Sequence, residues 1–174
     1  FMRHMLLGST AERMVSKTTR PMLVVKQAPH EPYKTVLVPV DFSAHSLRSI
    51  RIAQAVAPGA SLALLHAYDV PYEGMMEYAG VQADQIQHYR SKARQEALES
   101  MQALCEVAGL DPVFTPTVVM HGDPSLLLVQ QEQELDCDLI VMGKQGDNTL
   151  EDVLLGSVTR YALAQSQCDV LVSV

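Results

Sequence analysis

Cysteine is scarce in this sequence, and the cysteines present are far apart. Three occur in 174 residues, at Cys105, Cys137 and Cys168, and no Cys-x-x-Cys pair is formed. An odd, widely spaced set excludes a dense disulfide framework and offers no cysteine-based zinc motif. It predicts reduced, buried thiols and a cytoplasmic location.

Long apolar runs and excess positive charge are also missing. No stretch approaches the roughly 18 apolar residues that a membrane helix needs. The formal net charge is −7, so the sequence favours neither a nucleic acid nor an anionic membrane as a partner. The length predicts one domain with an appendage.

Several catalytic and cofactor motifs are absent as well. The chain has no Walker loop, no Gly-x-Gly-x-x-Gly fingerprint and no His-Glu-x-x-His. It places no nucleophile beside a general base, so no catalytic residues are predicted. No protein-held metal site is predicted either.

A glycine-containing stretch after an apolar strand is the most informative feature that is present. Residues 139–142 form a short apolar run, and a helical pattern begins near Ser157. Glycines let a backbone approach a ligand closely, and a helix N-terminus offers unpaired N–H groups to phosphate. We therefore predict a phosphate-binding loop in which Ser157 both caps the helix and donates its hydroxyl. Its members are Gly143, Gly146, Gly156, Ser157 and the backbone N–H of Val158.

The same residues also fit a purely structural role, as a turn followed by a helix cap. Lys144 either meets a phosphate as a point charge or is solvated. Asp147, together with Glu151 and Asp152, brings negative charge to this end of the loop, which leaves a triphosphate open to question. Asp147 or Asn148 could instead surround a magnesium ion bound with the ligand.

The spacing Gly143-x2-Gly146-x9-Gly156-Ser157 resembles the nucleotide-binding motif of the universal stress protein family. The resemblance covers residues 34–174. It includes Val-Pro-Val-Asp-Phe-Ser, Leu-Leu-His-Ala, Met-His-Gly-Asp-Pro and Asp-Val-Leu-Val, at residues 38–43, 64–67, 120–124 and 169–172.

Alternation of strands and helices with short connections predicts an α/β fold with a parallel sheet covered on both faces. The resemblance implies an open five-stranded, flavodoxin- or Rossmann-like sheet in the order 3-2-1-4-5. Strands are expected at residues 35–40, 60–68, 113–120, 137–142 and 170–174. Helices are expected at about residues 44–57, 81–108, 124–134 and 157–165, and a loop that serves as a lid or interface at 69–80.

Ligands of such sheets bind where the strand order reverses, which places Asp41 and Gly143 on either side of the crevice. The Asp41 carboxylate can accept hydrogen bonds from the two hydroxyls of a ribose, or it only orders its turn. By resemblance, the backbone at Ala67 contacts adenine, and Pro39 and Val40 line the base pocket. The nucleotide-binding set is Pro39, Val40, Asp41, Ala67, Met142, Gly143, Lys144, Gly146, Gly156, Ser157 and Val158.

Two histidines are candidate catalytic residues by type, but neither lies in a catalytic motif. His66 lies in an apolar strand, where a hydrogen-bonded core histidine is the simpler interpretation. His121 is followed by Gly-Asp-Pro, which is typical of a loop leading into a helix capped by Asp123.

The resemblance implies a stress-response regulatory module that binds an adenine nucleotide (ATP, ADP or AMP), with Mg²⁺ as a further candidate. One alternative is a slow ATPase, with turnover far below the ~10 per second of ordinary enzymes. The other is a partner-binding protein whose nucleotide site is vestigial.

An internal repeat explains the start of the chain. Leu-Leu-Gly-Ser at residues 6–9 recurs at 154–157, and at the same offset Leu23-Val24 aligns with Leu171-Val172. Residues 1–28 are therefore interpreted as the last helix and strand of a preceding copy, 29–33 as a linker and 34–174 as a complete domain. The apolar last strand predicts pairing at its edge, in a homodimer or with residues 22–26 of the same chain.

Overall fold

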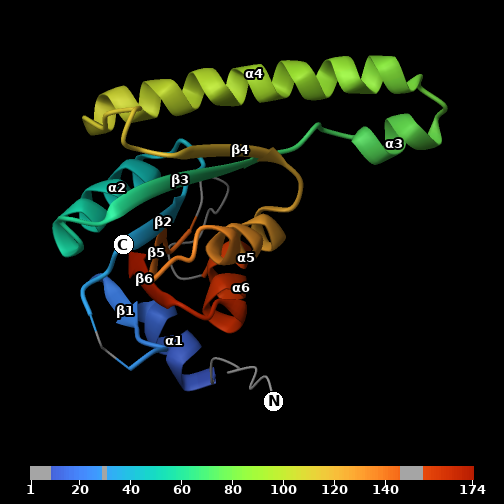
Figure 1. Ribbon diagram of the computed structural model, residues 1–174. Helices are drawn as coiled ribbons and strands as arrows, with labels where there is room; N and C mark the ends of the chain where they lie inside the picture. The colour runs from blue at the N-terminus through green and yellow to red at the C-terminus, as the bar shows by residue number, and fades with distance from the viewer. Residues whose placement is uncertain (1–8, 29–30, 146–154) are drawn as a thin grey trace.

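The computed structural model describes residues 9–28, 31–145 and 155–174, which form one six-stranded sheet with helices on both faces (Figure 1). The sheet order is β1-β6-β5-β2-β3-β4. Its strands are β1 (Met22–Val24), β2 (Thr35–Pro39), β3 (Ser61–Tyr68), β4 (Thr117–His121), β5 (Leu139–Gly143) and β6 (Asp169–Ser173). The strands β2 to β6 are parallel and follow the predicted order 3-2-1-4-5, whereas β1 adds an antiparallel strand beside β6.

Six helices accompany the sheet in the described residues. They are α1 (Ser9–Lys17), α2 (Ala44–Val56), α3 (Glu73–Tyr78), α4 (Ala83–Ala108), α5 (Pro124–Glu134) and α6 (Ser157–Gln165). The helices α2 and α4 cover one face, and α1, α5 and α6 cover the other.

The alternation of side chains along β2 explains why the protein has two cores. Val36 and Val38 point to one face, where they pack with Ile50 of α2. Leu37 points to the other face and packs with Leu163 of α6. A strand buried on both faces reads as a continuous apolar run, which is why residues 35–40 were recognisable as a strand.

Two predicted segments differ from the structure. Residues 69–80, expected as a loop, contain the short helix α3. The strand expected from residue 113 begins at Thr117. Asp111 accounts for this shift, because its side chain accepts the Val113 amide and its carbonyl accepts the Phe114 amide, so a turn precedes the strand.

The helix α4 is much longer than the sheet edge it covers. Figure 1 shows it extending past the ends of β3 and β4, with α3 beside its outer part. We call α3 (Glu73–Tyr78) together with the N-terminal part of α4, which contacts α3 through Arg90, the arm. None of the helices in the described ranges is long and apolar enough to cross a membrane.

The N-terminal segment closes the outer edge of β6. The strand β1 pairs with β6 in the same chain, with Leu23 opposite Leu171. Asp169 at the start of β6 accepts the backbone amides of Lys26 and Gln27, at 2.7 and 3.3 Å. The helix and strand expected from the repeat are present, whereas their origin in a preceding domain copy stays a prediction, as does a homodimer.

Candidate functional site

A cavity of about 540 Å³ opens at the carboxyl ends of β2 and β5, where the strand order reverses. All predicted nucleotide-site residues line it except Lys144 and Gly146. Gly146 lies outside the described residues, as do Asp147 and Asn148. The Lys144 amide donates to the Ser173 carbonyl and thereby continues the pairing of β5 with β6. Cavities of this size hold small-molecule ligands.

The two described glycines of the motif differ in whether a side chain would fit at their position. A Cβ atom on Gly143 would lie 3.0 Å from the Gln145 carbonyl oxygen, so the local fold itself favours glycine there. A Cβ atom on Gly156 would only make ordinary contacts, at 3.4 Å from the Lys144 oxygen and 3.5 Å from the Gln145 Cα. The Gly156 backbone, with φ of −59° and ψ of 152°, is open to any residue. Neither the backbone conformation nor packing against the described residues therefore explains a glycine at position 156.

The start of α6 faces the cavity, but it is not capped as predicted. Gly156 is the N-cap residue and Ser157 is the first helical residue, so the Ser157 hydroxyl does not cap the helix. Thr159 instead fixes the helix to the strand, because its hydroxyl donates to the Gly143 carbonyl at 2.8 Å. The first helical residues line the cavity, which leaves the polar start of α6 directed at any ligand there.

Asp41 orders the turn after β2 and also lines the cavity. Its Oδ1 atom accepts the hydroxyls of Ser43 and Ser46, each at 2.6 Å, and the Ser43 amide at 3.1 Å. Ser43 is the N-cap of α2, so the carboxylate positions the start of that helix. The structure therefore shows the structural role, while the exposed carboxylate remains at the cavity, where the ribose role stays a prediction.

His66 is a satisfied histidine, as predicted, but it also lines the cavity. Its Nδ1 atom lies 2.8 Å from the Val40 carbonyl oxygen. Because a carbonyl only accepts, Nδ1 carries the proton. The imidazole packs on the Phe42 ring with the ring centres 4.2 Å apart, and Phe42 has a left-handed φ of 66°. His66 thus fixes the wall of the cavity where Val40 lies.

Sequence reasoning missed other lining residues, notably His45 and Thr159. The position of Thr159 within the first turn after Gly156 was an available signal, since a hydroxyl there often bonds backbone groups. His45 gave no such signal, because it is brought to Gly143 only when α2 packs beside β5.

The predicted reduced thiols are unpaired and buried. Cys105, Cys137 and Cys168 are at most 8% exposed and form no disulfide. Burial is the main cause that raises the pKa of Cys137 to about 12, and it raises the pKa of Cys168 as well. These thiols are structural residues rather than nucleophiles.

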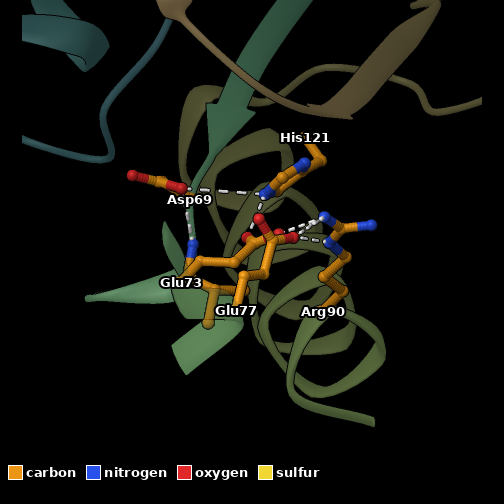
Figure 2. Close-up of polar contacts among 6 residues, drawn as sticks. Asp69, Glu73, Glu77, Arg90 and His121 are labelled. Atoms are coloured by element: carbon orange, nitrogen blue, oxygen red, sulfur yellow. Dashed lines mark hydrogen bonds and ion pairs between the residues drawn. The ribbon is translucent and has the colours of Figure 1, made fainter. Parts of the chain in front are cut away.

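The sequence Gly-Asp-Pro after β4 leads into a capped helix, as predicted. His121, which was expected in the loop before that helix, lies in β4 instead. Asp123 caps α5 by accepting the amides of Ser125 and Leu126. His121 is the last residue of β4, and its ring contacts Asp69 and Glu73 (Figure 2). These three residues form a second cluster that does not line the cavity.

The open, mostly parallel sheet with a cavity at its switch point is an α/β architecture in which ligands commonly bind at that position. A sequence model described as the universal stress protein family matches residues 32–173, and the chain belongs to this family. Universal stress protein MJ0531 of Methanocaldococcus jannaschii is 32% identical over 143 residues, which cover 80% of this chain and 81% of that protein.

Two solved structures illustrate the similarity in three dimensions. The structure of the hypothetical protein MJ0577 matches with a TM-score of 0.67 and 26% identity, covering 81% of this chain and 95% of that one. A universal stress protein solved in complex with cAMP matches with a TM-score of 0.50 and 28% identity, covering 83% and 98% respectively.

Proposed function

We propose that this chain binds an adenine nucleotide (ATP, ADP or AMP) in the cavity between β2 and β5, and acts as a stress-response regulatory module with at most slow hydrolysis. The observation that carries the proposal is Gly156. Its backbone and the described residues around it accept a side chain, yet it stands at the cavity beside the start of α6. A phosphate that approaches this backbone closely explains the glycine.

The remaining wall suits the rest of a nucleotide. In the proposed pose, Pro39 and Val40 border the base, the backbone at Ala67 contacts its edge, and Asp41 accepts the ribose hydroxyls. The family member solved with cAMP supports an adenine ligand, since that protein is 28% identical to this chain. Mg²⁺ would accompany the nucleotide at Asp147 or Asn148, which lie outside the described residues.

The cavity favours binding over catalysis. His66 lines it, but its Nδ1 proton is used on the Val40 carbonyl. The Ser46 hydroxyl and the Asp41 carboxylate both line the cavity and are hydrogen-bonded to each other, but Ser46 is buried and this contact orders the turn before α2. A ligand held beside such a structural pair is suited to changing the protein's conformation or contacts rather than to rapid turnover.

The test begins with the purified full chain. Denaturation followed by chromatography and mass spectrometry identifies any nucleotide that copurified, and calorimetry then measures binding of ATP, ADP and AMP to the stripped protein. We expect micromolar binding of at least one of them, and subsequent turnover assays separate a slow ATPase from a switch. Absence of binding for all three would overturn the proposal in favour of a partner-binding protein with a vestigial site.

A further inference from the structure

Three side chains with metal-binding groups meet at the base of the arm. Asp69 follows β3, Glu73 is the first residue of α3, and His121 is the last residue of β4. Figure 2 shows the His121 ring and the two carboxylates directed at one another. One ligand atom from each residue lies within 4.8 Å of the other two.

The distances suit a shared ion. His121 Nε2 lies 2.8 Å from Glu73 Oε2 and 3.6 Å from Asp69 Oδ1. Ligand bonds of about 2.0–2.2 Å at tetrahedral angles place neighbouring ligand atoms roughly 3.3–3.5 Å apart. The two observed separations bracket this value, so small side-chain rotations would complete three positions around one ion.

Arg90 of α4 orients the Glu73 carboxylate toward the proposed ion. Its guanidinium Nε donates to Glu73 Oε1 at 2.7 Å, and its Nη2 contacts the same oxygen. This contact leaves Oε2 directed at His121. An outer residue that orients a ligand in this way is a regular feature of metal sites.

The local charge also favours a cation. Glu73 and Glu77 both pair with the Arg90 guanidinium, and Asp69 adds a third carboxylate beside His121. The carboxylates of this cluster therefore outnumber the guanidinium, and a divalent ion would offset their charge. Arg90 and the ion would occupy different oxygens of Glu73, so the two cations need not compete.

The exposure of the three residues leaves room for exchange with solvent. The Glu73 side chain is 11% exposed and that of His121 30%, whereas that of Asp69 is 81% exposed. An ion bound to two partly buried side chains and one exposed side chain would keep coordination positions that water can occupy. One imidazole with two carboxylates suits Zn²⁺ or a similar transition ion better than Mg²⁺, which prefers oxygen ligands alone.

We propose that Asp69, Glu73 and His121 form a site for a divalent transition-metal ion that joins the arm to the carboxyl ends of β3 and β4. The site is separate from the nucleotide cavity, since none of the three residues lines it. An ion there fixes the start of α3 against β4. It thereby controls the position of the apolar residues that α3 exposes, among them Met75 and Tyr78, at 68% and 96%.

Zn²⁺ is the probe for the test. Chelator-treated protein, free of nucleotide, is titrated with Zn²⁺ by calorimetry, and circular dichroism verifies the fold of every variant. We expect one ion per chain in the wild type and at least tenfold weaker binding in Asp69→Asn, Glu73→Gln and His121→Ala. Asp69→Asn is the safest variant for folding, because this side chain is the most exposed and asparagine retains the oxygen that accepts the Val70 amide.

Two matched variants control for general effects. Glu77→Gln removes the same charge one turn further along α3, and His88→Ala removes a histidine of α4 outside the cluster. Both should bind Zn²⁺ as the wild type does. The proposal is overturned if the wild type does not bind Zn²⁺, if Asp69→Asn and Glu73→Gln bind it unchanged, or if Glu77→Gln weakens binding as much as they do.

Discussion

The backbone amide of Gly156 donates a hydrogen bond to the carbonyl of Lys144 at 3.0 Å. This bond ties the start of α6 to the end of β5, although the two residues are separated along the chain by the rest of the glycine motif. Together with the Thr159 hydroxyl on the Gly143 carbonyl, it holds the helix start at the cavity. Backbone groups that are already held in place lose less conformational freedom when they bind an anion.

Replacement of Gly156 by valine should abolish nucleotide binding while the fold persists. The Cβ atom would lie 3.4 Å from the Lys144 oxygen, its nearest neighbour among the described residues, but the two methyl groups beyond it would obstruct the approach of a phosphate. We expect at least a hundredfold loss of affinity by calorimetry, about 2.7 kcal/mol. Gly59→Val is the control, because a Cβ atom there has nothing within 4 Å. Equal affinity in Gly156→Val and wild type would contradict a phosphate at this backbone.

Asp41→Asn should weaken nucleotide binding about tenfold, since a charge-assisted hydrogen bond to a ribose hydroxyl contributes roughly 1.5 kcal/mol. Asparagine keeps an oxygen for the hydroxyls of Ser43 and Ser46, so the turn should survive. The decisive comparison uses ATP and its 2′,3′-dideoxy analogue. The loss caused by Asp41→Asn should disappear with the analogue, whereas an equal loss for both ligands would restrict Asp41 to ordering the turn.

Asp169→Ala should destabilise the protein by roughly 2–3 kcal/mol, because the partly buried Lys26 amide and Tyr33 hydroxyl lose their acceptor. The Asp169 side chain accepts the amides of Lys26 and Gln27 and the Tyr33 hydroxyl, and the residue is 6% exposed. Urea denaturation measures the loss, and hydrogen exchange should show weaker protection of residues 22–27. Asp84→Ala, which removes an exposed carboxylate, should change stability by less than about 0.5 kcal/mol. Unchanged protection of residues 22–27 would mean that Asp169 does not anchor this segment.

Stability should fall at high pH in a way that depends on Tyr33. Burial, followed by the hydrogen bond to Asp169, raises the pKa of Tyr33 from 10.0 to about 12. The folded state therefore holds this proton to a higher pH than the unfolded chain does. The contribution of Tyr33 is present in full below pH 10.0 and is lost as the pH rises to about 12.

Urea midpoints on either side of this window test the expectation. The wild type should lose more stability across it than Tyr33→Phe, which has no phenolic proton. Tyr89→Phe, at an exposed position of α4, should behave as the wild type. Parallel loss in wild type and Tyr33→Phe would show that other groups, such as the buried Cys137 thiol, account for the whole effect.

The sheet could be predicted because its signals are local. Buried strands such as residues 35–40 are continuous apolar runs, and Asp123-Pro124 marks a helix start. The strand order came from the family resemblance. The turn at Asp111 and the helix α3 were missed, because α3 is short, contains Gly74 and lies after a proline, which is typical of a loop.

The cavity wall was predicted in large part for the same reason, since the motif fixes which residues end β2 and β5. The helix begins at Ser157 as expected, but the capping role of Ser157 was wrong, because Gly156 occupies the N-cap position. The cluster of Asp69, Glu73 and His121 could not be found from spacing. Its members are brought together only by the pairing of β3 with β4 and by the position of α3.

The most direct test of the central claim follows the backbone amides of the isotope-labelled wild type by NMR during titration with ATP. We expect the largest shifts at Gly143, Ala67 and Gly156–Val158, while amides on the exposed side of α4 such as that of Glu96 remain unchanged. Shifts that gather elsewhere, or the absence of any shift at millimolar ATP, would contradict a nucleotide site between β2 and β5.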